Sequence, residues 1–337
     1  YLNWHEQFFT DYISNKCNTN CLFSTNPSDV SKADVVVFLA STFYRSEPQF
    51  PKRSKPSTIF VLHTMEQPMY VPMLNEYQFL KQNFDLLATY SQELVYPNSG
   101  VPNLPLTYYP LHVYDSSAVL TPPKTFKEKD GYGTGVNVVT FISNCKKAGG
   151  ANRLKFIKEL MNYIPIHSYG GCLNNRQEQE IPYDSRWPKH DQRRARKFKT
   201  LENYKFYLAF ENLGVADYVS EKVYEGLIAG TLPVYRGAES ITKFMPSRNA
   251  IINANQMTAK EIADLLIHLS TNEEEYNKYF EYRKQPLSDQ FKEVTQRSYC
   301  HPNVLCRLCD YSLERKAKLE TKNGKRHLRL NNTTNIH

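Results

Sequence analysis

Short apolar runs of strand length recur along this chain and alternate with segments of helical periodicity. Residues 33–40 (ADVVVFLA) and 58–63 (TIFVLH) are β-branched and continuously apolar, which is typical of strands buried on both faces of a parallel sheet. A second series starts at residues 136–143 (VNVVTFIS), followed by a turn rich in Gly and Lys and then by a helix with one apolar face. Repeated strand–helix units predict doubly wound α/β domains.

The second half of the chain continues this alternation. Residues 166–169 and 204–211 are predicted strands, and a helix capped by Asp217 is predicted to run to Ala229 and to end at Gly230. A strand follows at residues 232–235, and a later helix opens with a capping box formed by Thr258 and Glu261. We therefore expect two Rossmann-like domains facing each other across a cleft.

A segment poor in periodicity separates the two series. Residues 115–135 gather Pro, Gly and Lys, as linkers and exposed crossovers do. The predicted organisation is an N-terminal domain with its linker at 1–135, a C-terminal domain at 136–312 and a basic tail at 313–337.

Composition restricts the class of protein without choosing a function. The 337 residues are 41% hydrophobic, enough for two cores, and carry a formal net charge of +8, which suits an anionic partner. No apolar run is long enough to cross a membrane. Cysteines at 17, 21, 145, 172, 300, 306 and 309 favour structural disulfides in an oxidising compartment, with at least one thiol unpaired.

The most informative stretch is residues 206–237, FYLAFENLGVADYVSEKVYEGLIAGTLPVYRG. It reads as a strand, a polar loop and a helix start that carries Glu221 and Lys222. Free N–H groups and partial positive charge at a helix start, together with a lysine, suit a diphosphate, while a carboxylate can accept sugar hydroxyls. By itself, a Glu-Lys pair in a first helical turn is also typical of an ordinary solvated surface.

This stretch resembles the donor-binding motif of the α1,3-fucosyltransferases of glycosyltransferase family ten. Three further segments agree in order: Phe141 to Asn144 with Arg153 downstream, the SYGGC segment at 168–172, and CRLC at 306–309. The resemblance covers roughly residues 58 to 312. SNC, SYGGC and CRLC look most like the plant and invertebrate enzymes that fucosylate the N-glycan core.

The resemblance implies a GT-B fold and transfer of L-fucose from GDP-fucose, with inversion, onto a GlcNAc-containing glycan. It also implies that the diphosphate site needs no essential metal and that the reaction needs no other cofactor. The full-length protein is expected to reside in the Golgi and to carry an N-terminal membrane anchor. The donor-site residues that it implies are Ser143, Asn144, Arg153, Tyr169, Tyr207, Asn212, Tyr218, Glu221 and Lys222. Core packing is the alternative role for Tyr207.

The general base is predicted in the first half, at Glu66 in HTMEQPMYVPML. This segment resembles the family's ESP segment, with Gln67 in place of the usual Ser. One carboxylate suffices for inversion, because it need only take the proton of the acceptor hydroxyl as GDP leaves. Glu76 is the rival base, and His63 could touch the acceptor.

Other interpretations remain open from the sequence. Cys300, Cys306, Cys309 and His301 could bind zinc, although disulfides are favoured. The basic run at 189–199 could bind nucleic acid, but a solvated loop is the better prediction. A Lewis-type α1,3-fucosyltransferase, a protein O-fucosyltransferase and a catalytically silent glycan-binding protein are the alternatives to transfer onto the N-glycan core.

Overall fold

The computed structural model describes residues 17, 21–43, 50–53, 55–111, 113–130, 135–145, 150–187, 189–300 and 303–332. The chain forms two compact α/β units. Unit 1 comprises Tyr1–Leu106 and Tyr299–His337, and unit 2 comprises Thr107–Ser298.

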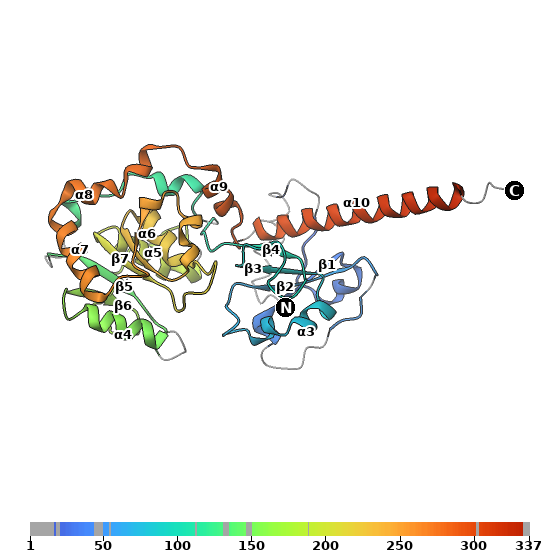
Figure 1. Cartoon of the computed structure of the whole chain (residues 1–337), viewed down its shortest axis with the longest axis horizontal. Coiled ribbons are helices and arrows are strands. Elements are labelled where there is room, and N and C mark those ends of the chain that lie inside the picture. The colour runs from blue at the N-terminus through green and yellow to red at the C-terminus, as the bar shows by residue number, and fades with distance from the viewer. Residues whose placement is uncertain are drawn as a thin grey trace. The chain divides into compact units, whose positions relative to one another are not determined.

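Unit 1 contains a four-stranded parallel sheet in the order β1-β2-β3-β4 (Figure 1). The strands are β1 (Val35–Leu39), β2 (Ile59–Thr64), β3 (Leu86–Thr89) and β4 (Asn103–Pro105). Alternate residues of β2 enter two different apolar clusters, Ile59 and Val61 in one and Phe60 and Leu62 in the other. The strand is therefore buried on both faces, and the strands predicted at 33–40 and 58–63 are confirmed.

The C-terminal segment belongs to unit 1. Helix α10 (Asn303–Asn332) begins by placing Val304, Leu305 and Leu308 in the cluster that contains Ile59 and Val61. Disulfides join Cys17 to Cys306 and Cys21 to Cys309, so the first turns of α10 are linked covalently to the start of the chain. Because the sulfur atoms of Cys306 and Cys309 form disulfides, the zinc interpretation of CRLC is excluded. The other helices of unit 1 are α2 (Ala40–Phe43) and α3 (Tyr77–Asn83).

Unit 2 contains a five-stranded parallel sheet in the order β6-β5-β7-β8-β9 (Figure 1). Its strands are β5 (Val138–Phe141), β6 (Ile166–Tyr169), β7 (Phe206–Phe210), β8 (Leu232–Arg236) and β9 (Ile252–Asn253). The chain leaves β5 for the edge strand β6 and then returns to pair β7 on the other side of β5. In open α/β sheets such a reversal of direction, at the carboxyl ends of the strands, is where ligands bind.

Helices cover both faces of the second sheet. They are α4 (Gly150–Leu160), α5 (Gln192–Leu201), α6 (Glu221–Ala229), α7 (Ala259–Thr271), α8 (Glu273–Lys278) and α9 (Asp289–Gln296). The end of α6 is as predicted, since Gly230 adopts φ of 73° at its C-cap, and both hydrogen bonds of the Thr258–Glu261 capping box are present. The two parallel sheets confirm the predicted α/β class.

Short 3-10 helices complete the description. They are Pro27–Lys32, Pro72–Asn75, Ser116–Leu120, Glu128–Asp130, Lys189–Asp191, Glu239–Phe244, Arg248–Ala250 and Glu281–Lys284.

Two local predictions were wrong. The N-cap of α6 is Ser220, whereas Asp217 lies in the preceding loop with φ of 60°. The basic run at 189–199 is not a solvated loop, because most of it forms α5, whose Ala195 and Phe198 enter a core cluster. Charged residues had obscured the helical spacing of its few apolar residues.

The division into units also differs from the domain prediction. Thr107 starts unit 2, well before the predicted boundary at 135, and the chain re-enters unit 1 at Tyr299. The β-bridge between Thr107 and Ser298 marks both crossings, and Thr107 Oγ1 donates to Val294 O at 2.7 Å. Backbone pairing of two segments almost two hundred residues apart carries no local sequence signal.

Candidate active site

The candidate site of unit 2 lies where β5, β6 and β7 end and α6 begins. Because these strands are parallel, the segments that follow them emerge at one edge of the sheet. Ser143 and Asn144 follow β5, Tyr169 ends β6, Asn212 follows β7, and Glu221 opens α6. Residues that are far apart in the sequence are thus brought to one edge.

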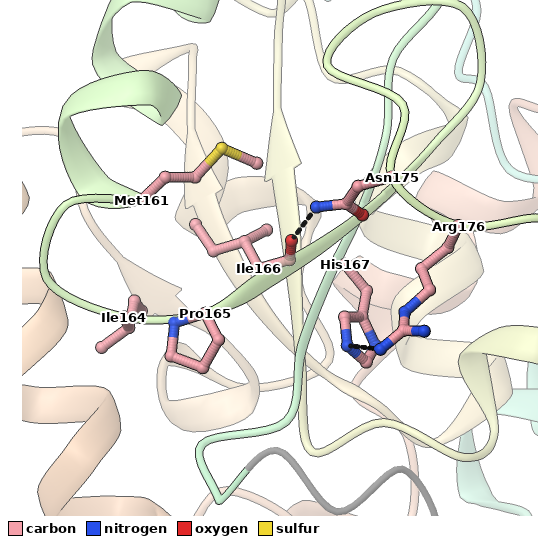
Figure 2. A pocket seen from close by; sticks show the side chains of 7 residues that line it. All are labelled: Met161, Ile164, Pro165, Ile166, His167, Asn175 and Arg176. Atoms are coloured by element: carbon pink, nitrogen blue, oxygen red, sulfur yellow. Dashed lines mark hydrogen bonds between the residues drawn. The ribbon is translucent and has the colours of Figure 1, made fainter.

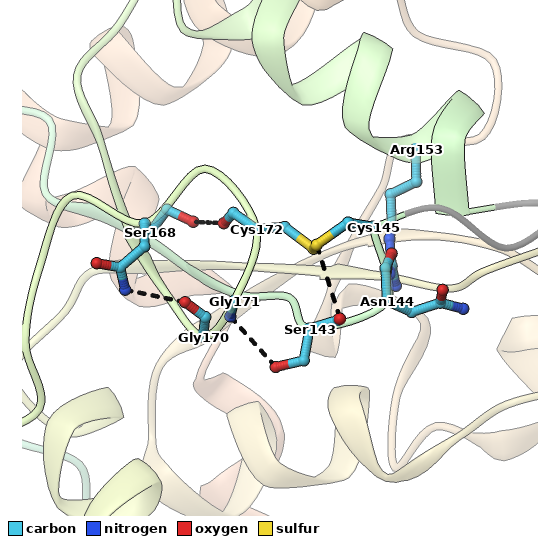
Figure 3. Close-up of a disulfide and its surroundings, with 9 residues drawn as sticks. Ser143, Asn144, Cys145, Arg153, Ser168, Gly170, Gly171 and Cys172 are labelled. Carbon is cyan, nitrogen blue, oxygen red and sulfur yellow. Dashed lines mark hydrogen bonds between the residues drawn. A yellow bond between two sulfur atoms is a disulfide. The ribbon is translucent and has the colours of Figure 1, made fainter.

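Covalent and polar contacts hold the loop after β5 (Figure 3). Cys145 and Cys172 form a disulfide with a Cα–Cα distance of 5.6 Å, and Gly171 N donates to Ser143 Oγ at 3.4 Å. The disulfide joins the loops that follow the adjacent strands β5 and β6. Three disulfides join six of the seven cysteines and do not include Cys300, which confirms the predicted structural disulfides and the odd cysteine outside them.

Arg153 of α4 reaches the same edge. Its side chain is largely buried and donates from Nη1 to Phe210 O at 3.0 Å and from Nη2 to Asn144 O at 3.5 Å. One guanidinium therefore spans the ends of β5 and β7. These bonds orient a fixed positive charge beside the predicted donor residues, as a diphosphate contact requires.

A buried carboxylate organises the start of α6. Glu211 accepts hydrogen bonds from Ser220 N and Ser220 Oγ, both at 2.8 Å, and from Lys222 Nζ at 3.2 Å. Lys222 Nζ also donates to Ser220 Oγ at 2.7 Å. Burial opposes the charged form of Lys222, but Glu211 and then Glu221 outweigh it and raise the pKa of this ammonium well above its usual value. Lys222 is therefore a permanently charged and firmly placed cation.

Glu221 is the more accessible carboxylate of this region. Its side chain is 31% exposed and pairs with Lys222 Nζ at 3.4 Å. Burial alone would raise its pKa, but the neighbouring cations Lys222, Lys197 and Arg194 lower the pKa of Glu221 to about 2. An ionised, partly exposed carboxylate is suited to accept hydrogen bonds from sugar hydroxyls.

The predicted tyrosines are mainly buried. Tyr207 lies inside β7 within a core cluster, and burial raises the pKa of its hydroxyl, so core packing accounts for this position. Tyr218 is buried and packs edge-to-face with Tyr108, with ring centroids 5.8 Å apart. Tyr169 stacks on Phe141 with centroids 4.9 Å apart and hydrogen bonds Tyr204. Asn212 is half-buried in the loop after β7.

Two hollows flank β6. A polar pocket of about 330 Å³ lies at its carboxyl end, lined by Tyr169 and by the arginines Arg176, Arg193 and Arg196 among others. A hollow of about 500 Å³ beside the start of the strand is lined by residues that include Met161 and His167 (Figure 2). Burial and then Arg176 lower the pKa of His167, which disfavours the charged form of this imidazole, and Arg176 also lines the hollow.

The predicted base lies in unit 1. Glu66 is exposed just after β2, and its backbone N–H donates to Thr64 Oγ1 at 3.0 Å. Glu76, the rival, is also exposed and precedes α3 without capping it through its side chain. His63 contacts Ala88 O through Nδ1 at 3.1 Å, and burial lowers its pKa, in keeping with a structural role. Gln67, in contrast to Glu66, is fully buried.

Comparison with known families agrees with this arrangement. The C-terminal model of glycosyltransferase family 10 (fucosyltransferase) matches residues 134–326, and the N-terminal fucosyltransferase model matches residues 1–94. The chain belongs to glycosyltransferase family 10. The motif of residues 206–237, with Glu211, Glu221 and Lys222, lies within the first match.

Several curated proteins are similar to the chain. A fucosyltransferase-like protein from Arabidopsis thaliana is 30% identical over 258 residues, which cover 76% of this chain and 43% of the relative. Alpha-(1,3)-fucosyltransferase B from Drosophila melanogaster is 29% identical over 299 residues, or 85% and 63%. GDP-fucose protein O-fucosyltransferase 3 from Gallus gallus is 37% identical over 134 residues, or 40% and 27%. The chain thus spans about half the length of the first two relatives.

Solved structures support the fold. A crystal structure of an alpha1,3-fucosyltransferase with GDP matches with a TM-score of 0.51 at 16% identity, covering 81% of this chain and 78% of that one. A further alpha1,3-fucosyltransferase structure gives 0.50 at 18% identity, with coverages of 81% and 78%. The predicted GT-B fold is confirmed.

In the part of the chain that the structure describes, no helix is both long and apolar enough to cross a membrane.

Sequence reasoning missed three charged residues in and beside the candidate site. Glu211 was part of the quoted motif but received no role, although a glutamate at the end of an apolar strand is a signal that a buried cation lies nearby. Glu225 and Lys197 were also missed, because their pairing joins two helices and leaves no pattern in either segment.

Proposed function

We propose that this family-10 chain transfers L-fucose from GDP-fucose to a GlcNAc hydroxyl of a glycan in α1,3 linkage, with inversion. The observation that carries the proposal is the hydrogen-bonded set Glu211, Ser220 and Lys222 at the start of α6. It supplies a fixed ammonium for a diphosphate beside an ionised Glu221 for sugar hydroxyls.

The donor half of the reaction follows from these charges. Lys222 and Arg153 would bind the diphosphate and stabilise the negative charge that grows on GDP as the glycosidic bond breaks. Ser143, Asn144, Tyr169, Asn212 and Tyr218 would line the donor site. Since two cations can supply this stabilisation, we propose that no divalent metal is essential.

The acceptor half depends on Glu66. An exposed carboxylate can accept the proton of the acceptor hydroxyl while that oxygen attacks the anomeric carbon from the face opposite to GDP. The stereochemistry inverts because the displacement is single.

We propose the GlcNAc of the N-glycan core as the acceptor, and the Golgi lumen as the location of the full-length protein. The acceptor rests on the likeness of SNC, SYGGC and CRLC to core enzymes, and the location on family membership. Three disulfides agree with a secretory compartment.

Turnover assays test the proposal directly. The protein is incubated with GDP-fucose and core N-glycans, Lewis-type acceptors or peptides with hydroxyl side chains, with and without EDTA, and GDP release and product masses are measured. We expect a fucosylated core N-glycan and activity that survives EDTA. Absence of GDP release above background on every acceptor would refute enzymatic transfer.

Protein O-fucosylation is the second candidate, favoured by the 37% identity to the Gallus gallus protein O-fucosyltransferase over 134 residues. A fucosylated peptide together with an unmodified N-glycan would support it and overturn the proposed acceptor.

Variants assign the roles of the two halves. Glu66→Gln is expected to abolish transfer and to leave GDP affinity unchanged, with Glu76→Gln as the matched control that stays active. Lys222→Ala is expected to weaken GDP and GDP-fucose alike, by about tenfold or more for one lost charge-assisted contact. Lys260→Ala, an exposed lysine on α7, should bind both normally. Loss of transfer in Glu76→Gln alone would move the base to Glu76.

A further inference from the structure

The polar pocket at the carboxyl end of β6 is lined by hydrogen-bond donors and acceptors together. Its volume of about 330 Å³ is within the range of small-molecule sites. Arginines and Asn174 offer donors there, whereas Glu178 and Glu180 offer carboxylate acceptors. A simple anion would be repelled by the carboxylates, so the lining suits a ligand that both donates and accepts hydrogen bonds.

The pocket adjoins the loop that carries Ser143 and Asn144. Gly170 lines the pocket, and the N–H of Gly171 donates to Ser143 Oγ at 3.4 Å (Figure 3). Asn144 O in turn accepts a hydrogen bond from Arg153 Nη2 at 3.5 Å. A ligand whose diphosphate lies at Arg153 can therefore extend past this loop into the pocket.

A chain of hydrogen bonds fixes the guanidinium of Arg176 at the pocket. Arg176 Nη2 donates to His167 Nε2 at 3.0 Å (Figure 2). Because a guanidinium only donates, Nε2 accepts, and the proton of the neutral imidazole is on Nδ1, which lies 2.7 Å from Tyr204 Oη. Tyr204 Oη is in turn 3.0 Å from Tyr169 Oη. Within the described residues no carboxylate pairs with Arg176, so its other N–H groups are available to a ligand.

Glu178 supplies the more covered acceptor of the pocket. Its side chain is 17% exposed, and Oε2 lies 3.6 Å from Arg196 Nε, an ion pair rather than a hydrogen bond. Arg196 also pairs with Glu180, whose side chain is 86% exposed. One cation therefore serves two carboxylates, and the carboxylate of Glu178 accepts no hydrogen bond from the part of the chain that the structure describes. A ligand that donates to Glu178 would satisfy this acceptor.

We propose that this pocket binds the guanine base of GDP-fucose, with Arg176 donating to O6 and N7 and Glu178 accepting from N1–H and the exocyclic amino group. The inference rests on the function proposed above, in which no residue is assigned to the base. A fixed guanidinium matches the two acceptors on one edge of guanine, and a carboxylate matches the two donors on the other. Adenine has a donor where guanine has O6, so the same side chains select against adenine.

Changes in the ligand that match the two side chains test the assignment in the intact protein. Inosine diphosphate lacks the amino group that Glu178 would bind, and a deaza analogue of GDP has carbon in place of the N7 that Arg176 would bind. The affinities of GDP and both analogues are measured by calorimetric titration for the parent, Glu178→Gln and Arg176→Lys. Glu274→Gln and Arg248→Lys, at exposed positions, are the matched controls.

We expect the parent to bind GDP about tenfold more tightly than either analogue, for one lost charge-assisted hydrogen bond. Glu178→Gln should reduce the preference over inosine diphosphate to about twofold or less and keep the preference over the deaza analogue, because an amide opposes one guanine donor. Arg176→Lys should do the reverse, since an ammonium keeps the charge and loses the fork. Both controls should match the parent.

A ratio of two affinities on one preparation is independent of the folded fraction, so a destabilised variant still gives a result. Unchanged ratios in both variants would overturn the proposal, as would a parent that binds GDP and both analogues equally. Fucose transfer by a parent whose variants keep their ratios would refute this inference alone. The predicted changes in ratio without transfer to any acceptor would support the guanine site and refute the proposed function. Absence of GDP binding by the parent would refute both.

Discussion

The adjacent glycines of the SYGGC segment offer a sharp test of the loop that joins β6 to the candidate site. Gly170 has φ of 87°, a conformation that costs a residue with a side chain about 1–2 kcal/mol. A Cβ added there would lie 2.6 Å from Ile142 O, closer than Cβ atoms approach other heavy atoms in proteins. Gly171 has no such constraint, because its added Cβ would meet only Ser143 Cα, at 4.0 Å.

The Ile142 carbonyl cannot easily move away from the new methyl group. It accepts a hydrogen bond from Cys172 N at 2.9 Å, and Cys172 is bonded to Cys145. Overpacking against fixed atoms adds about 1–3 kcal/mol to the conformational strain. Gly170→Ala should therefore lower the free energy of unfolding by about 2–5 kcal/mol, whereas Gly171→Ala should change it by less than about 0.5 kcal/mol.

Chemical denaturation followed by circular dichroism, together with calorimetric titration of GDP, measures both effects. Movement of the Ile142 carbonyl would also displace Ser143, so we expect weaker GDP binding in Gly170→Ala alone. Equal stability and equal GDP affinity in the two variants would refute the reasoning, because it would show that the loop relaxes without cost.

Three further outcomes are expected. Glu211→Gln should lower the free energy of unfolding by about 3–5 kcal/mol in urea denaturation, because it leaves Lys222 buried without its main counter-charge. Glu274→Gln removes a surface carboxylate and should leave the free energy of unfolding unchanged. Equal effects of the two substitutions would contradict this. Removing the Cys145–Cys172 disulfide by serine substitution should cost about 3.5 kcal/mol for a loop of this length, and an unchanged denaturation midpoint would contradict that value. Burial lowers the pKa of Lys129 to about 7 against an ordinary 10.5, so the native state binds fewer protons than the unfolded state between these values. Stability should rise across that range in the parent more than in Lys129→Met, and parallel pH curves would refute this.

The sequence was sufficient to predict the strands that are buried on both faces of a sheet. The runs that became β2, β5 and β7 are mostly apolar because both faces of each strand are covered, so they could be recognised without knowing their neighbours. The SYGGC segment at 168–172 and residues 210–212 overlap or follow the ends of the strands predicted at 166–169 and 204–211. These elements define the fold class and the location of the candidate site.

Contacts between distant segments could not be predicted in this way. Helix α5 carries so many charged residues that only a few apolar residues mark its buried face. The ion pairs of Arg194 and Lys197 with Glu225 become evident only in the folded structure, because Glu225 lies on another helix. The crossing from unit 2 back to unit 1 depends on Thr107 bonding Val294 and Arg297, which no periodicity reveals. Pairing of specific polar groups is set by tertiary structure, whereas burial is visible in composition.

The charges of the candidate site give its salt dependence. Four cations and four carboxylates lie in this region, namely Arg153, Arg194, Lys197 and Lys222 with Asp191, Glu211, Glu221 and Glu225. The net charge of this set is about zero, because the cationic charge is balanced by carboxylates inside the protein. Attraction of a diphosphate therefore comes chiefly from placed hydrogen-bond donors at short range rather than from a diffuse basic surface, and contacts that are partly buried are screened little by salt. GDP affinity should accordingly fall by less than about tenfold between 50 and 500 mM salt in calorimetric titration. A steeper fall would indicate that exposed residues of the basic run at 189–199, such as Arg193, bind the nucleotide instead.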